Sequence, residues 1–371
     1  MAQVAPQRWL FSGPLDGTLF VGSALAAGLV VVVSHAAGIT GDTPLWAWLL
    51  FVLGIDVAHV WATLYRVYFD RAELARRPLL YAGAPLVAFG LSVVAHSVSP
   101  EFFWRCLAYV AVWHFIRQQV GWMVLYGRRA KDDERTIRFD QLVMWATTLG
   151  PVVWWHAHLP RPFWWFKEHD FIGGLPSWMG TVALVVHGAL LVSWLGLQLV
   201  RTRRGVTFPV GKLLLLSATW VTWFGGIVVA NDDFAFTVMN VTLHGVPYLA
   251  FLWRYAKGRH AESGYGALGL LVRGGVPFFF GALLVFAFVE ELLWDNLVWH
   301  ERTTVFGDAG LDFGPALLTL LVPLLSLPQT THYLLDGFVW KTRNDAALGV
   351  RLGWASAPST NAGVAQQEGV A

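Results

Sequence analysis

Four histidines that lie in apolar stretches are the residues of this sequence best suited to chemistry. They are His59, His114, His244 and His332. Two of them have an aspartate about one helical turn away, in Asp56-Val-Ala-His59 and in His332-Tyr-Leu-Leu-Asp336. Residues three or four apart share a helix face, and imidazole and carboxylate groups are ligands for transition metals. The sequence therefore predicts a metal site with ligands among Asp56, His59, His114, His244, His332 and Asp336.

The composition places these residues in a membrane protein. Of the 371 residues, 56% are hydrophobic and 13% are charged, whereas soluble domains carry about 25% charged residues. The 21 tryptophans fit this class, because tryptophan is enriched at membrane–water interfaces. A net charge of +2 indicates no nucleic-acid partner. The single cysteine, Cys106, excludes an internal disulfide and a cysteine-based metal site.

Ten apolar runs are long enough to cross a bilayer as helices. They lie at about 15–36, 44–69, 79–97, 101–126, 139–157, 176–200, 209–229, 234–256, 271–290 and 314–339. No cleavable signal peptide is recognised, so the first run is interpreted as the first span. The predicted fold class is an all-α polytopic membrane protein with a single transmembrane domain over residues 1–354. Residues 355–371 are rich in Ala, Ser, Gly and Gln, and we expect a disordered cytoplasmic tail there.

The distribution of charge predicts the orientation. Basic residues follow each even-numbered run, beginning at Arg71, Arg128, Arg201, Lys257 and Lys341. Acidic residues follow the seventh and ninth runs, where Glu290-Glu291 is expected to be a solvated helix end. Lysine and arginine are enriched in cytoplasmic loops. Both termini are therefore predicted to lie in the cytoplasm. The predicted location of the protein is the cell inner membrane.

This topology puts the four histidines in one layer. The intervals from each histidine to the next basic boundary residue are 12, 14, 13 and 9 residues, ending at Arg71, Arg128, Lys257 and Lys341. At 1.5 Å per residue, these intervals correspond to about 14–21 Å above the inner boundary. Ionisable groups at such a depth usually face the interior of a helix bundle.

Other polar side chains recur at helical spacing beside the histidines. Asp56, His59, Thr63 and Arg66 form one stripe. The residues expected to support the ligands or take part in catalysis are Arg66, Arg117, Gln118, Asn240 and Gln329. Arg66 and Arg117 would stabilise the metal site or hold an anionic head group. The competing interpretation is hydrogen bonding between helices without a metal. His187 has apolar neighbours and is expected to be a packing residue.

Dispersed histidines on several membrane spans resemble the non-haem iron family of fatty-acid desaturases, alkane hydroxylases and sterol hydroxylases. They also resemble the bacterial carotene-cleaving dioxygenases. The His-x-x-x-His and His-x-x-His-His boxes of the desaturase family do not occur in this sequence. The resemblance implies a mononuclear or dinuclear iron site that oxidises a lipophilic substrate with O2.

No cluster-binding cysteine set is present, so a cytoplasmic partner is expected to donate electrons. Three alternatives remain open from the sequence. They are a haem protein with histidine axial ligands, a proton-coupled transporter, and a metal-independent lipid-modifying transferase.

Overall fold

A computed structural model describes residues 8–263, 265–266, 268–341 and 345–354. Every regular element within these residues is a helix. The predicted tail at 355–371 lies outside the described residues.

The first half of the chain contains α1 (Gly13–Asp16), η1 (Gly17–Gly22), α2 (Ser23–Ala36), α3 (Leu45–Ala47), η2 (Trp48–Val57), α4 (Ala58–Val60), η3 (Leu64–Tyr68), α5 (Arg71–Arg76), α6 (Pro78–Val98), α7 (Pro100–Arg129) and α8 (Glu134–His156), where η marks a π-helix. The second half contains α9 (Ser177–Arg203), α10 (Val210–Trp223), η4 (Phe224–Val229), α11 (Asp233–Ser263), α12 (Leu268–Arg273), α13 (Gly275–Trp294), η5 (Asp295–Trp299), α14 (Thr303–Phe306), α15 (Pro315–Leu325), α16 (Leu327–Val339) and α17 (Ala346–Arg351).

All ten predicted runs are helical over most of their length. Among the described residues, seven helical segments are long and apolar enough to cross a membrane. They are Gly13–Ala36, Leu45–Tyr68, Pro78–Val98, Ser177–Arg203, Val210–Val229, Asp233–Glu262 and Gly275–Trp299. The other three runs correspond to α7, α8 and the pair α15–α16.

The tenth run is not one continuous helix as expected. It bends at Ser326, between α15 and α16. Pro328 lies in the first turn of α16. Proline lacks an N–H group and its ring clashes with the carbonyl four residues earlier, which favours an interruption of the helix just before this point.

The helix that carries His59 is irregular for a different reason. Its α-helical turn Ala58–Val60 lies between two π-helical stretches, Trp48–Val57 and Leu64–Tyr68. A π-helix pairs residues five apart and often occurs at functional sites. The irregular spacing changes which side chains share a face with His59.

Capping residues define the ends of the two long helices at the centre of the chain. Ser99 precedes Pro100 at the start of α7, and its Oγ accepts a hydrogen bond from the Phe102 amide at 3.0 Å. Asp133 accepts one from the Thr136 amide at 2.9 Å at the start of α8. Such caps satisfy amides that have no partner inside the helix.

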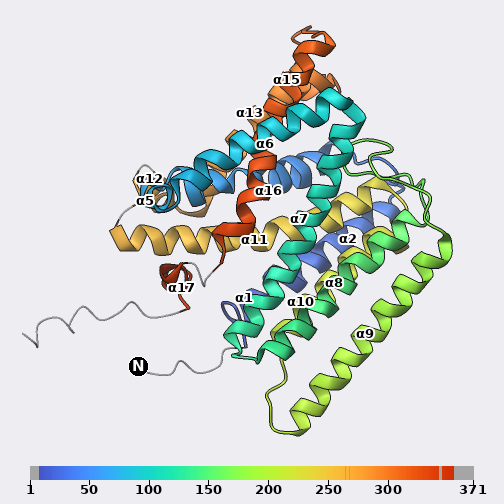
Figure 1. Cartoon of the computed structure of the whole chain (residues 1–371), viewed down its shortest axis with the longest axis vertical. Helices are drawn as coiled ribbons and strands as arrows, with labels where there is room; N and C mark the ends of the chain where they lie inside the picture. The colour runs from blue at the N-terminus through green and yellow to red at the C-terminus, as the bar shows by residue number, and fades with distance from the viewer. Residues whose placement is uncertain (1–7, 264, 267, 342–344, 355–371) are drawn as a thin grey trace, which may run out of the picture.

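The helices pack around α11, which crosses the middle of the molecule (Figure 1). In the most apolar stretch of α11, 78% of the residues are buried, whereas 17% are buried in the corresponding stretch of α9 at the edge of the molecule. Large apolar side chains such as Leu79 and Val192 are exposed on the outer helices. Outward apolar side chains on long apolar helices indicate a membrane protein.

The loops that the sequence predicts to be cytoplasmic meet at one end of the bundle. Ion pairs join Arg76 to Asp345 at 3.4 Å, Arg201 to Asp132 at 2.8 Å and Arg351 to Glu262 at 3.0 Å. The two ends of the described chain also meet there, because the Trp354 indole donates a hydrogen bond to the Leu10 carbonyl at 2.7 Å.

Candidate metal centre

Four helices bring the four predicted histidines together. His59 comes from α4, His114 from α7, His244 from α11 and His332 from α16. Three of these helices, α7, α11 and α16, cross near the centre of the molecule (Figure 1). Each of the four side chains is at most 5% exposed. We call these four residues the histidine cluster.

The ring nitrogens of the cluster converge. His59 Nε2 lies 3.0 Å from His244 Nε2, and His332 Nε2 lies 3.3 Å from His114 Nε2. One nitrogen each of His59, His114 and His244 lies within 4.8 Å of the others. Ligands bound at 2.0–2.1 Å around a tetrahedral or octahedral metal are about 2.9–3.4 Å apart. The shortest distances in the cluster therefore match those between ligands of one metal.

The ring nitrogens that point away from this convergence have polar neighbours on the His59 helix. Thr63 Oγ1 lies 2.9 Å from His332 Nδ1, and Asp56 Oδ1 lies 3.5 Å from His59 Nδ1. Metal-binding histidines usually form a hydrogen bond through the second nitrogen, which fixes the ring orientation. Thr63 makes such a contact with His332, whereas Asp56 Oδ1 and His59 Nδ1 lie close to each other without forming a hydrogen bond. Thr63 belongs to the polar stripe seen in the sequence, but its contact with another helix requires the fold.

Asp336 has other partners. Its Oδ1 accepts hydrogen bonds from the Tyr248 hydroxyl at 2.9 Å and from the Trp340 indole at 2.7 Å. Tyr248 also packs edge-on against His59 and His332. Asp336 thus acts on the cluster through Tyr248 in this structure, although the sequence places it as a ligand candidate.

Arg66 lies in a separate, fully buried ion-pair network. Its guanidinium pairs with Glu73 at 3.0 Å and Asp345 at 3.3 Å. It also donates hydrogen bonds to Tyr255 and to the Val339 carbonyl. These contacts connect α5 to the segment before α17, at the end of the bundle where the basic loops meet.

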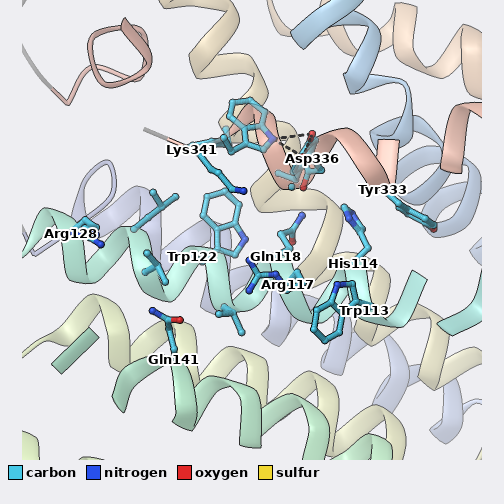
Figure 2. Close-up of a pocket in the computed structure, with 18 residues that line it drawn as sticks. Trp113, His114, Arg117, Gln118, Trp122, Arg128, Gln141, Tyr333, Asp336 and Lys341 are labelled. Carbon is cyan, nitrogen blue, oxygen red and sulfur yellow. Dashed lines mark hydrogen bonds between the residues drawn. The ribbon is translucent and has the colours of Figure 1, made fainter. Parts of the chain in front are cut away.

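A large open cavity extends from the histidine cluster toward that end. Its volume is about 670 Å³, and His114, Arg117, Gln118, Asp336 and Lys341 line it (Figure 2). Two predicted residues, Arg117 and Gln118, are therefore next to the cluster along a cavity wall. We call this space the inner cavity.

A smaller cavity of about 170 Å³ lies on the other side of the cluster. Asp56, Asn240 and Gln329 line it together with Glu290 and Glu291. The expectation that Glu290 is a solvated helix end is wrong. Its side chain is buried and accepts a hydrogen bond from the Trp61 indole at 2.7 Å. The reason is that Trp61, on the His59 helix, faces α13 and supplies the hydrogen bond.

Aromatic residues around the cluster are not identified by the sequence pattern. Phe115 stacks on His244, with ring centroids 3.6 Å apart and an interplanar angle of 8°. Tyr333 packs against His114 at 4.7 Å. Both are neighbours in sequence of cluster histidines, and Tyr248 is four residues after His244. These spacings could have suggested them, but aromatic residues are too common in this chain to single them out.

His187 is buried away from the cluster, and its Nε2 has no hydrogen-bond partner among the described residues. It is 2% exposed and lies in α9, with its Cβ close to Gly150 of α8. It shares no element with the cluster, and it provides a control for histidine substitutions.

The two aspartates of the predicted ligand set lead to different expectations. Asp56→Asn is expected to weaken metal binding about 10- to 100-fold, which is typical when a partner that orients a ligand histidine is lost. Asp336→Asn is expected to have a smaller effect, because Asp336 reaches the cluster only through Tyr248. Competition with a chromogenic chelator would measure both affinities. Equal losses in the two variants would contradict this assignment.

Gly245, directly after His244, allows a close approach of α11 to η2. A Cβ at this position would lie 2.2 Å from Ile55 Cγ2. We expect Gly245→Ala to reduce the free energy of unfolding by about 1–3 kcal/mol, as overpacking does, and to weaken metal binding by separating His244 from His59. Gly337→Ala is the matched control, because a Cβ at that α16 position meets nothing within 4 Å. Denaturant unfolding in detergent would show the difference, and equal stability of the two variants would refute it.

Comparisons of the chain with protein-family models, with curated proteins and with solved structures found no match.

Proposed function

We propose that this chain is a ten-span inner-membrane protein with both termini in the cytoplasm. The contacts among the loops after the second, fourth, sixth, eighth and tenth runs support this topology. The contact between Leu10 and Trp354 supports an even number of crossings, because both ends must then lie on one side. The seven most apolar helices give an odd number, so further crossings by α7, α8 and α15–α16 complete the count.

The proposed activity is metal-dependent oxidation of a lipophilic substrate with O2. The observation that carries this proposal is the convergence of four buried imidazoles, with Nε2 atoms 3.0 and 3.3 Å apart in two pairs. A metal bound to the Nε2 atoms would hold these rings in place.

Iron is the proposed metal, in a mononuclear or dinuclear site. Imidazole binds several transition metals, and a nearby carboxylate favours iron among those with redox chemistry. When bound, iron supplies the activation of O2. The protein residues hold the metal, orient its ligands through Asp56 and Thr63, and expose the site to substrate along the inner cavity. A cytoplasmic protein is the proposed electron donor.

The geometry favours this site over haem. Two axial ligands on opposite sides of one iron are about 4 Å apart, twice a metal–nitrogen bond length. The two closest nitrogen pairs are nearer than this. Four neighbouring pairs of rings also have centroids only 4.6–5.0 Å apart, which leaves no space for a macrocycle between them.

The test is metal analysis of the detergent-purified protein, prepared without chelators, together with its visible spectrum. We expect stoichiometric iron and no Soret band. A Soret band would assign the histidines to haem. A protein without any transition metal would refute the proposal and favour a transporter or a metal-independent transferase.

A further inference from the structure

The inner cavity contains polar groups that the protein itself leaves without partners. Gln118 is 8% exposed, and both atoms of its amide lack a hydrogen-bond partner among the described residues. The same is true of the indole Nε1 of Trp122, which is 4% exposed. Buried polar groups are nearly always paired in folded proteins. Two such groups on the wall of one cavity indicate that a ligand supplies the missing partners.

Two cations face the same space, and neither is paired with Asp336, the carboxylate that also lines it. Within the part of the chain that the structure describes, Arg117 makes a cation–π contact with Trp145 and Lys341 one with Phe338, and neither forms an ion pair. Figure 2 shows Arg117, Gln118 and Lys341 directed into the cavity between α7 and α16. Arg128, farther along the cavity, differs because it pairs with Glu134 at 2.8 Å.

The depth of Arg117 distinguishes it from an ordinary boundary arginine. It is eleven residues before Arg128 on a continuous helix, which corresponds to about 17 Å. An arginine side chain cannot cover this distance to reach the cytoplasmic head groups. An unpaired cation at such a depth is costly in a bilayer, so its retention calls for an anionic partner inside the cavity.

The rest of the cavity wall is apolar. Trp113, Leu125, Phe251 and Trp340 contribute to it. Its one carboxylate, Asp336, is already hydrogen-bonded to Tyr248 and Trp340. A ligand that fits these surfaces has an anionic group for Arg117 and Lys341 and an apolar chain for the aromatic walls.

We propose that the inner cavity binds an anionic amphiphile, with its carboxylate or phosphate between Arg117 and Lys341. Gln118 and Trp122 donate hydrogen bonds to the same group. This inference rests on the proposed function, since it names the class of the lipophilic substrate. Arg117 is one helical turn from His114, so the anionic group lies close to the histidine cluster and the apolar chain extends along the cavity.

The experiment is equilibrium binding to the full-length protein in a non-ionic detergent. The probes are radiolabelled palmitate, hexadecyl phosphate and uncharged hexadecanol, which share one chain. We expect the two anions to bind at least about tenfold more tightly than the alcohol, which corresponds to about 1.4 kcal/mol. Tighter binding of palmitate would identify a carboxylate ligand, and tighter binding of hexadecyl phosphate would identify a phosphate head group. Equal affinity for all three probes would overturn the proposal.

Variants localise the effect. Arg117→Gln is expected to remove most of the preference for anions, and Lys341→Gln part of it. Gln118→Leu provides a variant without a change of charge, and it is also expected to lower anion affinity. The control is Arg204→Gln, which removes an exposed positive charge from another basic loop. An unchanged anion preference in both Arg117→Gln and Gln118→Leu would overturn the site.

Binding is measured in the absence of turnover, with and without chelator treatment, and the metal content of each variant is determined in parallel. Loss of the anion preference with metal retained would reject only the substrate class. Absence of metal with the preference retained would reject only the proposed oxidation chemistry.

Discussion

Replacing His59 or His332 with alanine is expected to reduce bound metal from stoichiometric to less than about a tenth of the protein, a loss of more than tenfold in occupancy. Each residue belongs to one of the two close nitrogen pairs. His59→Ala also removes the contact between His59 and Asp56, and His332→Ala removes the contact between His332 and Thr63. Metal analysis after gel filtration would measure the change.

The control for this experiment is His187→Ala. It deletes an equally buried imidazole in α9, outside the cluster. If metal is lost from all three variants, the cause is a general disturbance of the fold. If both cluster variants keep their metal, the assignment of the site is wrong. Circular dichroism is expected to show the same helix content in all of them, because none of the substitutions removes a helix cap.

The second large effect is expected for Arg66→Met. It removes the most buried cation beside Glu73 and Asp345, which keep only their pairs with the more exposed Arg76 and, for Asp345, with Arg351. Breaking a buried ion pair from one side typically costs about 3–5 kcal/mol, so we expect the free energy of unfolding to fall by that amount. The matched control is Arg128→Met, which removes a pair whose partners are both more than half exposed and is expected to cost at most about 1 kcal/mol.

The same ion-pair network predicts that the free energy of unfolding depends on pH. Burial alone would raise the pKa of Glu73. The positive charge of Arg66 and the hydrogen bonds from Tyr81 and Arg76 outweigh it, so the pKa lies below the ordinary value of 4.5. A carboxylate with a lowered pKa stabilises the folded state fully above its unfolded pKa, and this contribution is lost as pH falls through the folded value.

Unfolding measured between neutral pH and pH 3 should therefore show a loss of stability below about pH 4.5 in the native protein. The loss should be smaller in Arg66→Met, because that variant lacks the charge that lowers the pKa. A steeper acid loss in the variant would contradict this role for Arg66. Metal content per folded molecule is expected to remain unchanged, since Arg66 contacts none of the cluster histidines.

Much of the site could be predicted from the sequence because histidines are rare in apolar helices and costly there. Their common distance from the basic loops predicts one layer, and the structure brings His59, His114, His244 and His332 together in space. The pairing of Asp56 with His59 follows from local spacing. Arg66 shows the limit of such spacing, because its partners are 7 and 279 residues away and only the fold determines them.

The cavities could not be predicted in the same way. Arg117 and Gln118 share a cavity wall with Asp336 and Lys341 because α7 packs against α16. Glu290 differs from the prediction for a similar reason. Its sequence neighbours suggest solvent, but a tryptophan from another helix covers it. Contacts between segments that are far apart in the sequence decide which polar groups are buried, and hydropathy alone does not predict these contacts.

The π-helical stretches beside His59 have a consequence for how this sequence can change. A π turn contains one residue more than an α turn, so the segment Trp48–Val57 holds more residues than an α-helix of the same rise. Loss of one residue there can convert a π turn to an α turn, with His59 still facing its three neighbours. The α7 helix holds no such extra residue. Loss of one residue before His114 would therefore rotate that side chain by about 100°. Deletion of one residue is therefore expected to be tolerated before His59 and not before His114.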